Sequence, residues 1–136
     1  MIRAILGKKG SGKTKRIIDM ANDALKTEHG DVVFIDDDDR YMYDLRHEIR
    51  FVNAACYKIK SADMFLGFLS GMLAQNFDIT MICVDAFARL VKDDLSGMAC
   101  FFERLAALSE EHKVDFVLSI SGDPEGMPAF VTRYCA

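Results

Sequence analysis

The chain lacks the features that mark several classes of protein. It contains no tryptophan and only 2 prolines in 136 residues. No apolar run approaches the length of a membrane span. The N-terminus runs directly into a segment rich in glycine and lysine, without the apolar stretch of a secretory signal. We therefore expect a cytoplasmic protein that has no membrane-embedded part.

Clustered cysteines and an excess of basic charge are also missing. The 4 cysteines form no C-x-x-C pair and no cluster with histidine: Cys56, Cys83, Cys100 and Cys135. This spacing indicates neither a zinc site nor a redox motif. The net charge of −4 argues against a nucleic-acid surface that works through bulk electrostatics, although it leaves a local basic patch open.

Four apolar runs predict buried strands. They do not alternate with polar residues, so both faces of the sheet must be covered: Ile2 to Leu6, Val32 to Ile35, Ile79 to Val84 and Val114 to Ile120. The segments between them are long enough for helical crossovers, which favours a parallel sheet built from right-handed βαβ units. We expect an α/β fold, a three-layer α/β/α sandwich with a mostly parallel sheet, as one domain over residues 1–136.

The helices are predicted from apolar residues that recur three and four positions apart. One such pattern covers Ile17 to Leu25, a second follows Ser61 as N-cap, and a third covers residues 97–112. Three weaker patterns predict a helix over Tyr41 to Ile49, a short strand over Ala54 to Ile59 and a last strand near Ala129 to Tyr134.

A phosphate-binding motif follows the first expected strand. It fits G-x-x-x-x-G-K-[ST] without a mismatch: Gly7-Lys8-Lys9-Gly10-Ser11-Gly12-Lys13-Thr14. Glycines let successive N–H groups point at phosphate oxygens, and the start of a helix adds positive partial charge. Lys13 would reach the β- and γ-phosphates, and the Thr14 hydroxyl would complete a Mg²⁺ shell. Residues 7–14 are therefore the expected binding site for Mg·ATP, although the Lys8 and Lys9 side chains are expected to face solvent.

Acidic residues close two of the other expected strands. Asp85 follows Ile79 to Val84 and is the expected second Mg²⁺ ligand, acting through a water. The next residue is Ala86 rather than Glu, so a base for hydrolysis must lie elsewhere. Asp36, Asp37, Asp38 and Asp39 close the second strand at the edge where ligands bind in such folds. They form either a solvated strand exit or a site in which one of them is a base or a metal ligand.

These residues together resemble the RecA class of P-loop ATPases. The strand Val33 to Asp38 is similar to the class's second strand, and Val84-Asp85-Ala86 is similar to its Mg²⁺-binding strand. The resemblance implies that Asp38 stands at the position of a catalytic Glu, one methylene shorter, and that Ser121 stands near a polar sensor position. The chain also resembles small stand-alone P-loop proteins of Firmicutes-type bacteria, sometimes labelled twitching-motility ATPases. That likeness rests on Ile5 to Lys15 and on Tyr43-Asp44, and it implies nucleotide binding.

The expected function is that of an ATP-binding domain, a slow or partner-dependent ATPase acting as a switch, with Asp38 and Lys13 as the catalytic candidates. The alternative is a small-molecule kinase that uses Asp36 to Asp39 for its acceptor. A kinase needs a mobile lid with arginines, and only Arg89 and Arg104 lie between Asp85 and Val114. A GTPase is disfavoured because no N-K-x-D motif occurs. A protein partner and an oligomer both stay open.

Overall fold

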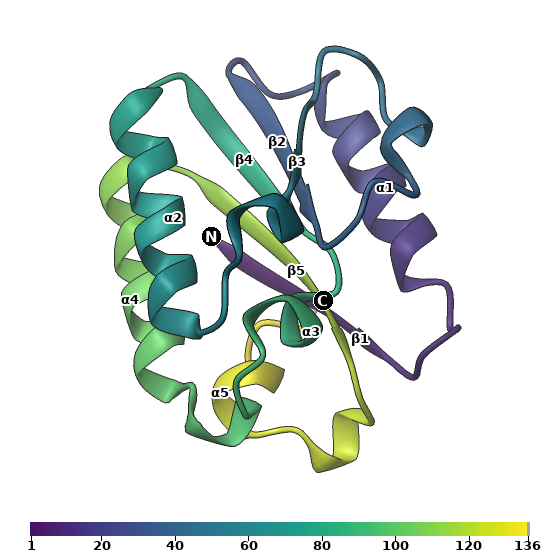
Figure 1. Cartoon of the computed structure of the whole chain (residues 1–136), viewed down its shortest axis with the longest axis vertical. Coiled ribbons are helices and arrows are strands. Elements are labelled where there is room, and N and C mark those ends of the chain that lie inside the picture. Colours follow the sequence, from purple (N-terminus) through teal and green to yellow (C-terminus); the bar gives the residue numbers. More distant parts are fainter. Residues whose placement is uncertain (136) are drawn as a thin grey trace.

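The structure is a computed structural model that describes residues 1–135 of the chain. Its centre is a five-stranded parallel sheet with the order β1-β5-β4-β2-β3 (Figure 1). The strands are β1 (Ile2–Gly7), β2 (Asp31–Asp36), β3 (Arg50–Asn53), β4 (Ile79–Val84) and β5 (Asp115–Ser121). The order places β5 between the strand that precedes the phosphate loop and the strand that precedes Asp85.

Helices cover both faces of this sheet. One face packs against α1 (Lys13–Ala24), which buries Ile17, Ile18, Ala21 and Ala24. The other face packs against α2 (Ala62–Gln75) and α4 (Ala99–His112), which lie side by side in Figure 1. The short helices α3 (Phe87–Val91) and α5 (Ala129–Thr132) join this second layer. The predicted three-layer α/β/α sandwich is confirmed, with a sheet that is parallel throughout.

The larger core lies on the side of α2 and α4 and is dominated by phenylalanine. Phe65 of α2, Phe87 of α3 and Phe101 of α4 pack with ring centroids 5.2 to 6.4 Å apart. Rings that pack tilted or offset add to the stabilisation from burial alone. The cluster ties α3, which directly follows Asp85, to the two long helices, so the segment that carries Asp85 rests on a packed layer.

The strongest sequence patterns are confirmed. The four apolar runs are strands, and Ser61 caps α2 by accepting a hydrogen bond from the Met64 N–H at 3.1 Å. Among the described residues no helix combines the length and the apolar composition needed to cross a bilayer.

The three weaker patterns are wrong. The segment predicted as a helix over Tyr41 to Ile49 contains only a 3₁₀ turn at Met42–Asp44. The strand expected over Ala54 to Ile59 is found earlier, as β3. It ends where the Asn53 side chain accepts a hydrogen bond from the Ala55 N–H at 3.1 Å and starts a 3₁₀ turn. Side-chain bonds of this kind compete with the sheet for backbone groups.

The last predicted strand, Ala129 to Tyr134, is the helix α5. Pro128 precedes this helix, and proline with its fixed φ is favourable at a helix start. Beyond the helix the chain still reaches the free edge of β1, where the Ala4 N–H donates to the Tyr134 carbonyl at 2.8 Å. The pairing of this region with the sheet is therefore a single bridge at Cys135 rather than a strand.

Candidate functional site

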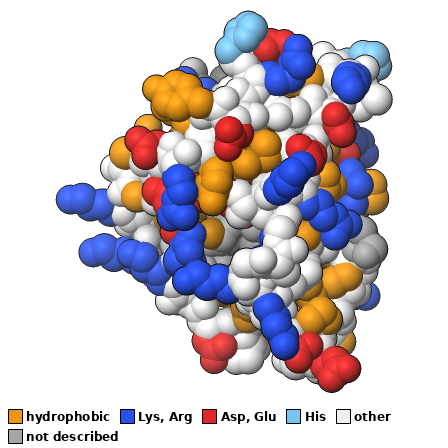
Figure 2. Space-filling model, turned by 90° about the vertical axis from the view of Figure 1, so that its right-hand side faces the viewer, with side chains coloured by type: hydrophobic (Ala, Val, Ile, Leu, Met, Phe, Trp, Pro, Cys, Tyr) orange, Lys and Arg blue, Asp and Glu red, His pale blue; other side chains and the backbone are white. Residues whose placement is uncertain are grey.

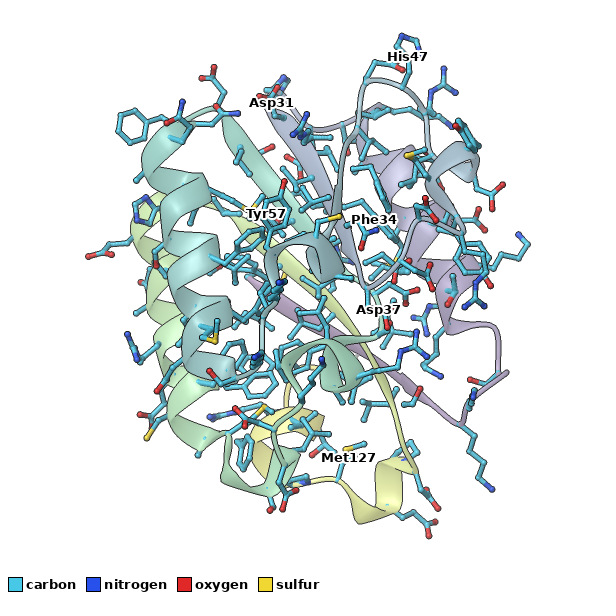
Figure 3. The ribbon with its side chains drawn as sticks, in the orientation of Figure 1. Asp31, Phe34, Asp37, His47, Tyr57 and Met127 are labelled. Atoms are coloured by element: carbon cyan, nitrogen blue, oxygen red, sulfur yellow. The ribbon has the colours of Figure 1, made fainter. Side chains whose placement is uncertain are left out.

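The site lies at the edge of the sheet where all strands have their carboxyl ends. Because the strands are parallel, the residues that follow β1, β2, β4 and β5 meet there. In Figure 3, Asp31 and Asp37 mark the two opposite ends of β2, and Asp37 lies at the site. A cavity of about 780 Å³ opens at this edge. Its walls come from the phosphate loop, α1, the acidic segment after β2, residues 85–89 and the end of β5.

The loop between β1 and α1 has the backbone geometry that the motif requires. Gly10 and Gly12 have φ angles of 82° and 91°, in the left-handed region that side chains with a Cβ rarely adopt. A Cβ on Gly7 would collide with the Ser11 hydroxyl. Helix α1 begins at Lys13 with no side-chain cap and no acidic residue in its first turn. Its first N–H groups and the positive end of its dipole are thus available to an anion.

The lysines of the loop differ in their surroundings. The Lys13 ammonium donates to the Lys8 carbonyl oxygen at 2.9 Å, which holds it over the loop on the cavity side. The Lys8 and Lys9 side chains are exposed, and Lys9 borders the cavity. Lysine and arginine side chains project from the face of the molecule seen in Figure 2, which is turned toward the α1 layer. The cavity is therefore lined by basic side chains, among them Lys9 and Lys13 of the loop, as well as by aspartates.

Thr14 and Asp85 meet although they lie 71 positions apart. The Thr14 hydroxyl donates to Asp85 Oδ2 at 3.0 Å. The other oxygen, Oδ1, accepts a hydrogen bond from the Ser119 hydroxyl, and Ser119 Oγ accepts from the Ala86 N–H at 2.9 Å. Asp85 is only 4% exposed, so these bonds fix its carboxylate in one orientation. A hydroxyl beside a carboxylate at a phosphate loop is an all-oxygen donor set, and it fits Mg²⁺.

Ser119 explains how this pair is held across the sheet. It lies in β5, the strand between β1 and β4, and it is 1% exposed. Ser121, the residue singled out from the RecA resemblance, is exposed on the cavity wall at the end of the same strand. The buried serine thus orients Asp85, while the exposed serine faces the ligand space.

The four aspartates after β2 are not equivalent, and Asp36 is the buried one. It is 2% exposed, lines the cavity, and its Oδ1 accepts a hydrogen bond from the Asp37 N–H at 2.8 Å. Burial raises the pKa of Asp36 to about 7, and the negative charge of Asp85 adds to the rise, partly offset by the hydrogen bond from Asp37. Asp36 and Asp85 are therefore neighbouring carboxylates in a poorly solvated place.

Asp37 is bound by Arg89 of α3. Arg89 Nε donates to Asp37 Oδ2 at 2.5 Å and Nη2 donates to Oδ1 at 3.1 Å. Partial burial raises the pKa of Asp37, but the hydrogen bonds and charge of Arg89 outweigh it and the net shift is downward. The pair joins the segment after β2 to the helix that follows Asp85, so it braces the two acidic strand ends against each other.

Asp38, the predicted catalytic residue, lies farther out. Its Oδ1 accepts from the Arg40 N–H at 2.9 Å and its Oδ2 from Arg40 Nη2 at 3.1 Å. The side chain is 39% exposed and lines the cavity. Asp39 is exposed. Of the four carboxylates at the end of β2, one is thus buried, two are bonded to arginines and one is in solvent.

The comparisons with known proteins bear on the fold. No protein-family model and no curated protein sequence matches the chain. Among solved structures it is similar to the flagellar accessory protein FlaH from Methanocaldococcus jannaschii, at 16% sequence identity and a TM-score of 0.59. The alignment covers 97% of this chain and 65% of that protein. The fold is RecA-like.

This likeness confirms the predicted RecA-like core and reaches no further. The chain spans about two thirds of the longer protein, and so low an identity carries the fold alone. The resemblance to small P-loop proteins of Firmicutes-type bacteria stays a prediction.

From the sequence, Asp36 was not singled out among the four aspartates and Ser119 was not named. Asp36 was grouped with the other three aspartates, although only the first acidic residue after an apolar run still belongs to the buried strand. Ser119 had a signal of its own, since it is the one polar residue between Phe116 and Ile120. A polar side chain inside a buried strand needs a hydrogen-bond partner, and here the partner is Asp85.

The burial of Asp36 predicts a stability that depends on pH. An acid whose pKa is higher in the folded than in the unfolded state destabilises the fold increasingly as pH rises from the unfolded pKa through the folded one. We expect Asp36→Asn to raise the free energy of unfolding at pH 8 by about 1–3 kcal/mol, the usual cost of an unsatisfied buried group. The gain should shrink as the pH is lowered toward 4.

Urea unfolding at several pH values, in EDTA, measures this effect. Asp39→Asn makes the same chemical change at an exposed position and should leave stability nearly unchanged at every pH. A wild-type protein that is more stable than Asp36→Asn at pH 8 would contradict the assignment.

Proposed function

We propose that the chain binds Mg·ATP at the carboxyl edge of its sheet and works as a slow or partner-dependent ATPase. The observation that carries this proposal is the contact between Thr14 and Asp85 beside an uncapped helix start. It unites a hydroxyl and a carboxylate from distant parts of the chain at the mouth of a glycine-rich loop. A chance turn rich in glycine and lysine has no reason to face a buried acid.

In this proposal the backbone N–H groups of residues 7–14 bind the phosphates. Lys13 exchanges its bond with the Lys8 carbonyl for the β- and γ-phosphate oxygens, which form stronger, charge-assisted hydrogen bonds. Thr14 and Asp85 would hold Mg²⁺, and its positive charge would offset the negative charge of the phosphates. Ser119 keeps the Asp85 carboxylate in position.

Several observations favour slow turnover. No glutamate follows Asp85, and Asp38, the proposed base, is engaged by Arg40 through both oxygens. Arg89, the arginine on the cavity wall beside Asp85, is tied to Asp37. An arginine supplied by a partner is worth about 10³–10⁵ in rate in comparable enzymes. A second protein, or another copy of the chain, that supplies one would therefore accelerate hydrolysis.

Nucleotide binding is tested by Lys13→Ala. Loss of the ammonium removes the charge-assisted bonds to the phosphates, and we expect ATP affinity to fall by about 10–100-fold or more. Isothermal titration calorimetry measures the change. Lys26→Ala serves as the control, because it removes an exposed lysine that lies just beyond the end of α1 and pairs with Asp23. Equal affinity in wild type and Lys13→Ala would refute the proposed site.

The role of Asp85 is tested through the metal. Because its carboxylate acts through the cation, Asp85→Asn should weaken Mg·ATP binding more than binding of ATP in EDTA. Calorimetry with and without Mg²⁺ separates the two. A loss of the same size under both conditions would mean that Asp85 supports the loop rather than the metal.

A small-molecule kinase is the second candidate, and one feature of the cavity favours it. The cavity continues from the phosphate loop along α1 past Asp19 and Asn22 to Tyr41 and Asp44. This extension leaves space beside Asp38 for an acceptor. Against it, neither arginine between Asp85 and Val114 forms a lid, because Arg89 pairs with Asp37 and Arg104 with Asp63.

Turnover measurements on wild type and on Asp38→Asn test the role of Asp38, and added hydroxylated compounds distinguish an ATPase from a kinase. If Asp38 positions the attacking water, the variant should lose about 10²–10⁴-fold in phosphate release, the usual contribution of a general base. Release of phosphate is followed with ATP alone and with a panel of small hydroxylated compounds. Unchanged turnover in Asp38→Asn would remove it from the mechanism. ADP formation only in the presence of a hydroxylated compound would favour the kinase.

A further inference from the structure

Three carboxylates at the end of β2 converge on one point. One oxygen each from Asp36, Asp37 and Asp38 lie within 4.8 Å of one another. Groups of acidic residues are common on protein surfaces, where water and counter-ions separate their charges. Convergence alone is therefore no evidence of a ligand. Whether a cation binds here depends on the burial and the hydrogen bonding of Asp36.

Asp36 differs from exposed aspartates in its burial and in having an oxygen without a hydrogen-bond partner. It is 2% exposed, and no group of residues 1–135 forms a hydrogen bond with its Oδ2. Only two other buried side-chain atoms of the described chain share this condition, Arg3 Nε and Thr80 Oγ1, and neither is a carboxylate oxygen. A buried polar atom without a partner is costly and needs an explanation.

The carboxylate of Asp36 is also oriented. Its Oδ1 accepts the Asp37 N–H, and the side chain borders the cavity. Rotation that would bring Oδ2 to another donor would break this bond. This bond fixes the orientation of the Asp36 carboxylate at the end of β2, beside Asp37 and Asp38.

We propose that Asp36, Asp37 and Asp38 bind a hard divalent cation, Mg²⁺ or Mn²⁺, without the help of a nucleotide. All three donors are carboxylate oxygens, and this donor type selects Mg²⁺, Mn²⁺ or Ca²⁺ over the softer metals that prefer nitrogen or sulfur. Waters complete the coordination from the open cavity.

Two guanidinium groups oppose the cation, and the aspartates outweigh them. The Arg89 guanidinium donates one hydrogen bond to each oxygen of Asp37. Arg40 donates to Asp38 once through its guanidinium and once through its backbone N–H. A carboxylate has about four lone-pair sites, so each of these side chains keeps free positions for a metal. Asp85 is a fourth carboxylate whose charge acts on Asp36. Negative charge remains in excess at the site.

This cation is distinct from the Mg²⁺ of the bound nucleotide. The latter uses Thr14 and Asp85 and needs phosphate oxygens to complete its shell. The former uses oxygens on β2 and on the segment that follows it. A cation at the three aspartates would neutralise the charge of the buried Asp36, which lies near Asp85. The two proposed cation sites would thus border the same cavity but use different residues.

The test is a titration of the nucleotide-free protein with Mn²⁺, followed by the loss of the free-ion EPR signal. We expect one tight Mn²⁺ per wild-type chain and an affinity at least about tenfold lower in Asp36→Asn, because the buried ligand is lost. Asp39→Asn, the same change one position beyond the group, should bind like wild type. Asp38→Asn should weaken binding as well.

The variants also separate this proposal from nucleotide binding. Lys13→Ala should lose affinity for ATP but still bind Mn²⁺. The nucleotide site and the cation site can therefore be refuted independently of each other. Circular dichroism and urea unfolding establish that Asp36→Asn is folded, and Mn²⁺ should stabilise the wild type against urea but not this variant. Wild type that takes up Mn²⁺ only with ATP would overturn the proposal. So would equal binding by Asp36→Asn, or an equal loss in Asp39→Asn.

Discussion

The parallel alignment of all five strands is the constraint on which the site depends. It brings the carboxyl ends of β1, β2, β4 and β5 to one edge, so that a glycine loop, two buried acids and two serines meet there. An antiparallel neighbour would send one of these ends to the opposite edge. The crossover helices that this alignment requires also supply the start of α1, whose free N–H groups face the same cavity.

Burial of negative charge is the second physical theme. Asp36 ends β2 and Asp85 directly follows the neighbouring strand β4, and both are almost inaccessible to water. Their hydrogen bonding differs. Each oxygen of Asp85 accepts a hydrogen bond, one from Thr14 and one from Ser119, whereas one oxygen of Asp36 has no partner. Two carboxylates so placed repel each other unless a proton or a cation intervenes. The proposed binding of a cation and of phosphate at this edge rests on this buried negative charge and on the glycine loop.

The arginines around the site restrain the acids rather than face the phosphate loop. Arg89 forms a bidentate pair with Asp37, and Arg40 bonds Asp38 through one guanidinium nitrogen and through its backbone N–H. A bidentate guanidinium–carboxylate pair has a fixed geometry and resists rearrangement. The proposed slow turnover rests on this arrangement, because it leaves neither arginine free to contact a phosphate.

The sequence alone was enough for the strong strands, because long apolar runs are local signals. It also singled out residues 7–14 and Asp85, which the fold brings together through Thr14, and their binding roles stay predictions. It failed for residues 41–59 and 129–134, where short patterns compete with turn-forming side chains such as Asn53 and with pairing to distant strands. Tertiary structure alone decided that Ser119 holds Asp85 and that one oxygen of the buried Asp36 has no partner. The physical reason is that burial and hydrogen-bond partners come from neighbours across the sheet, which no local pattern of residues records.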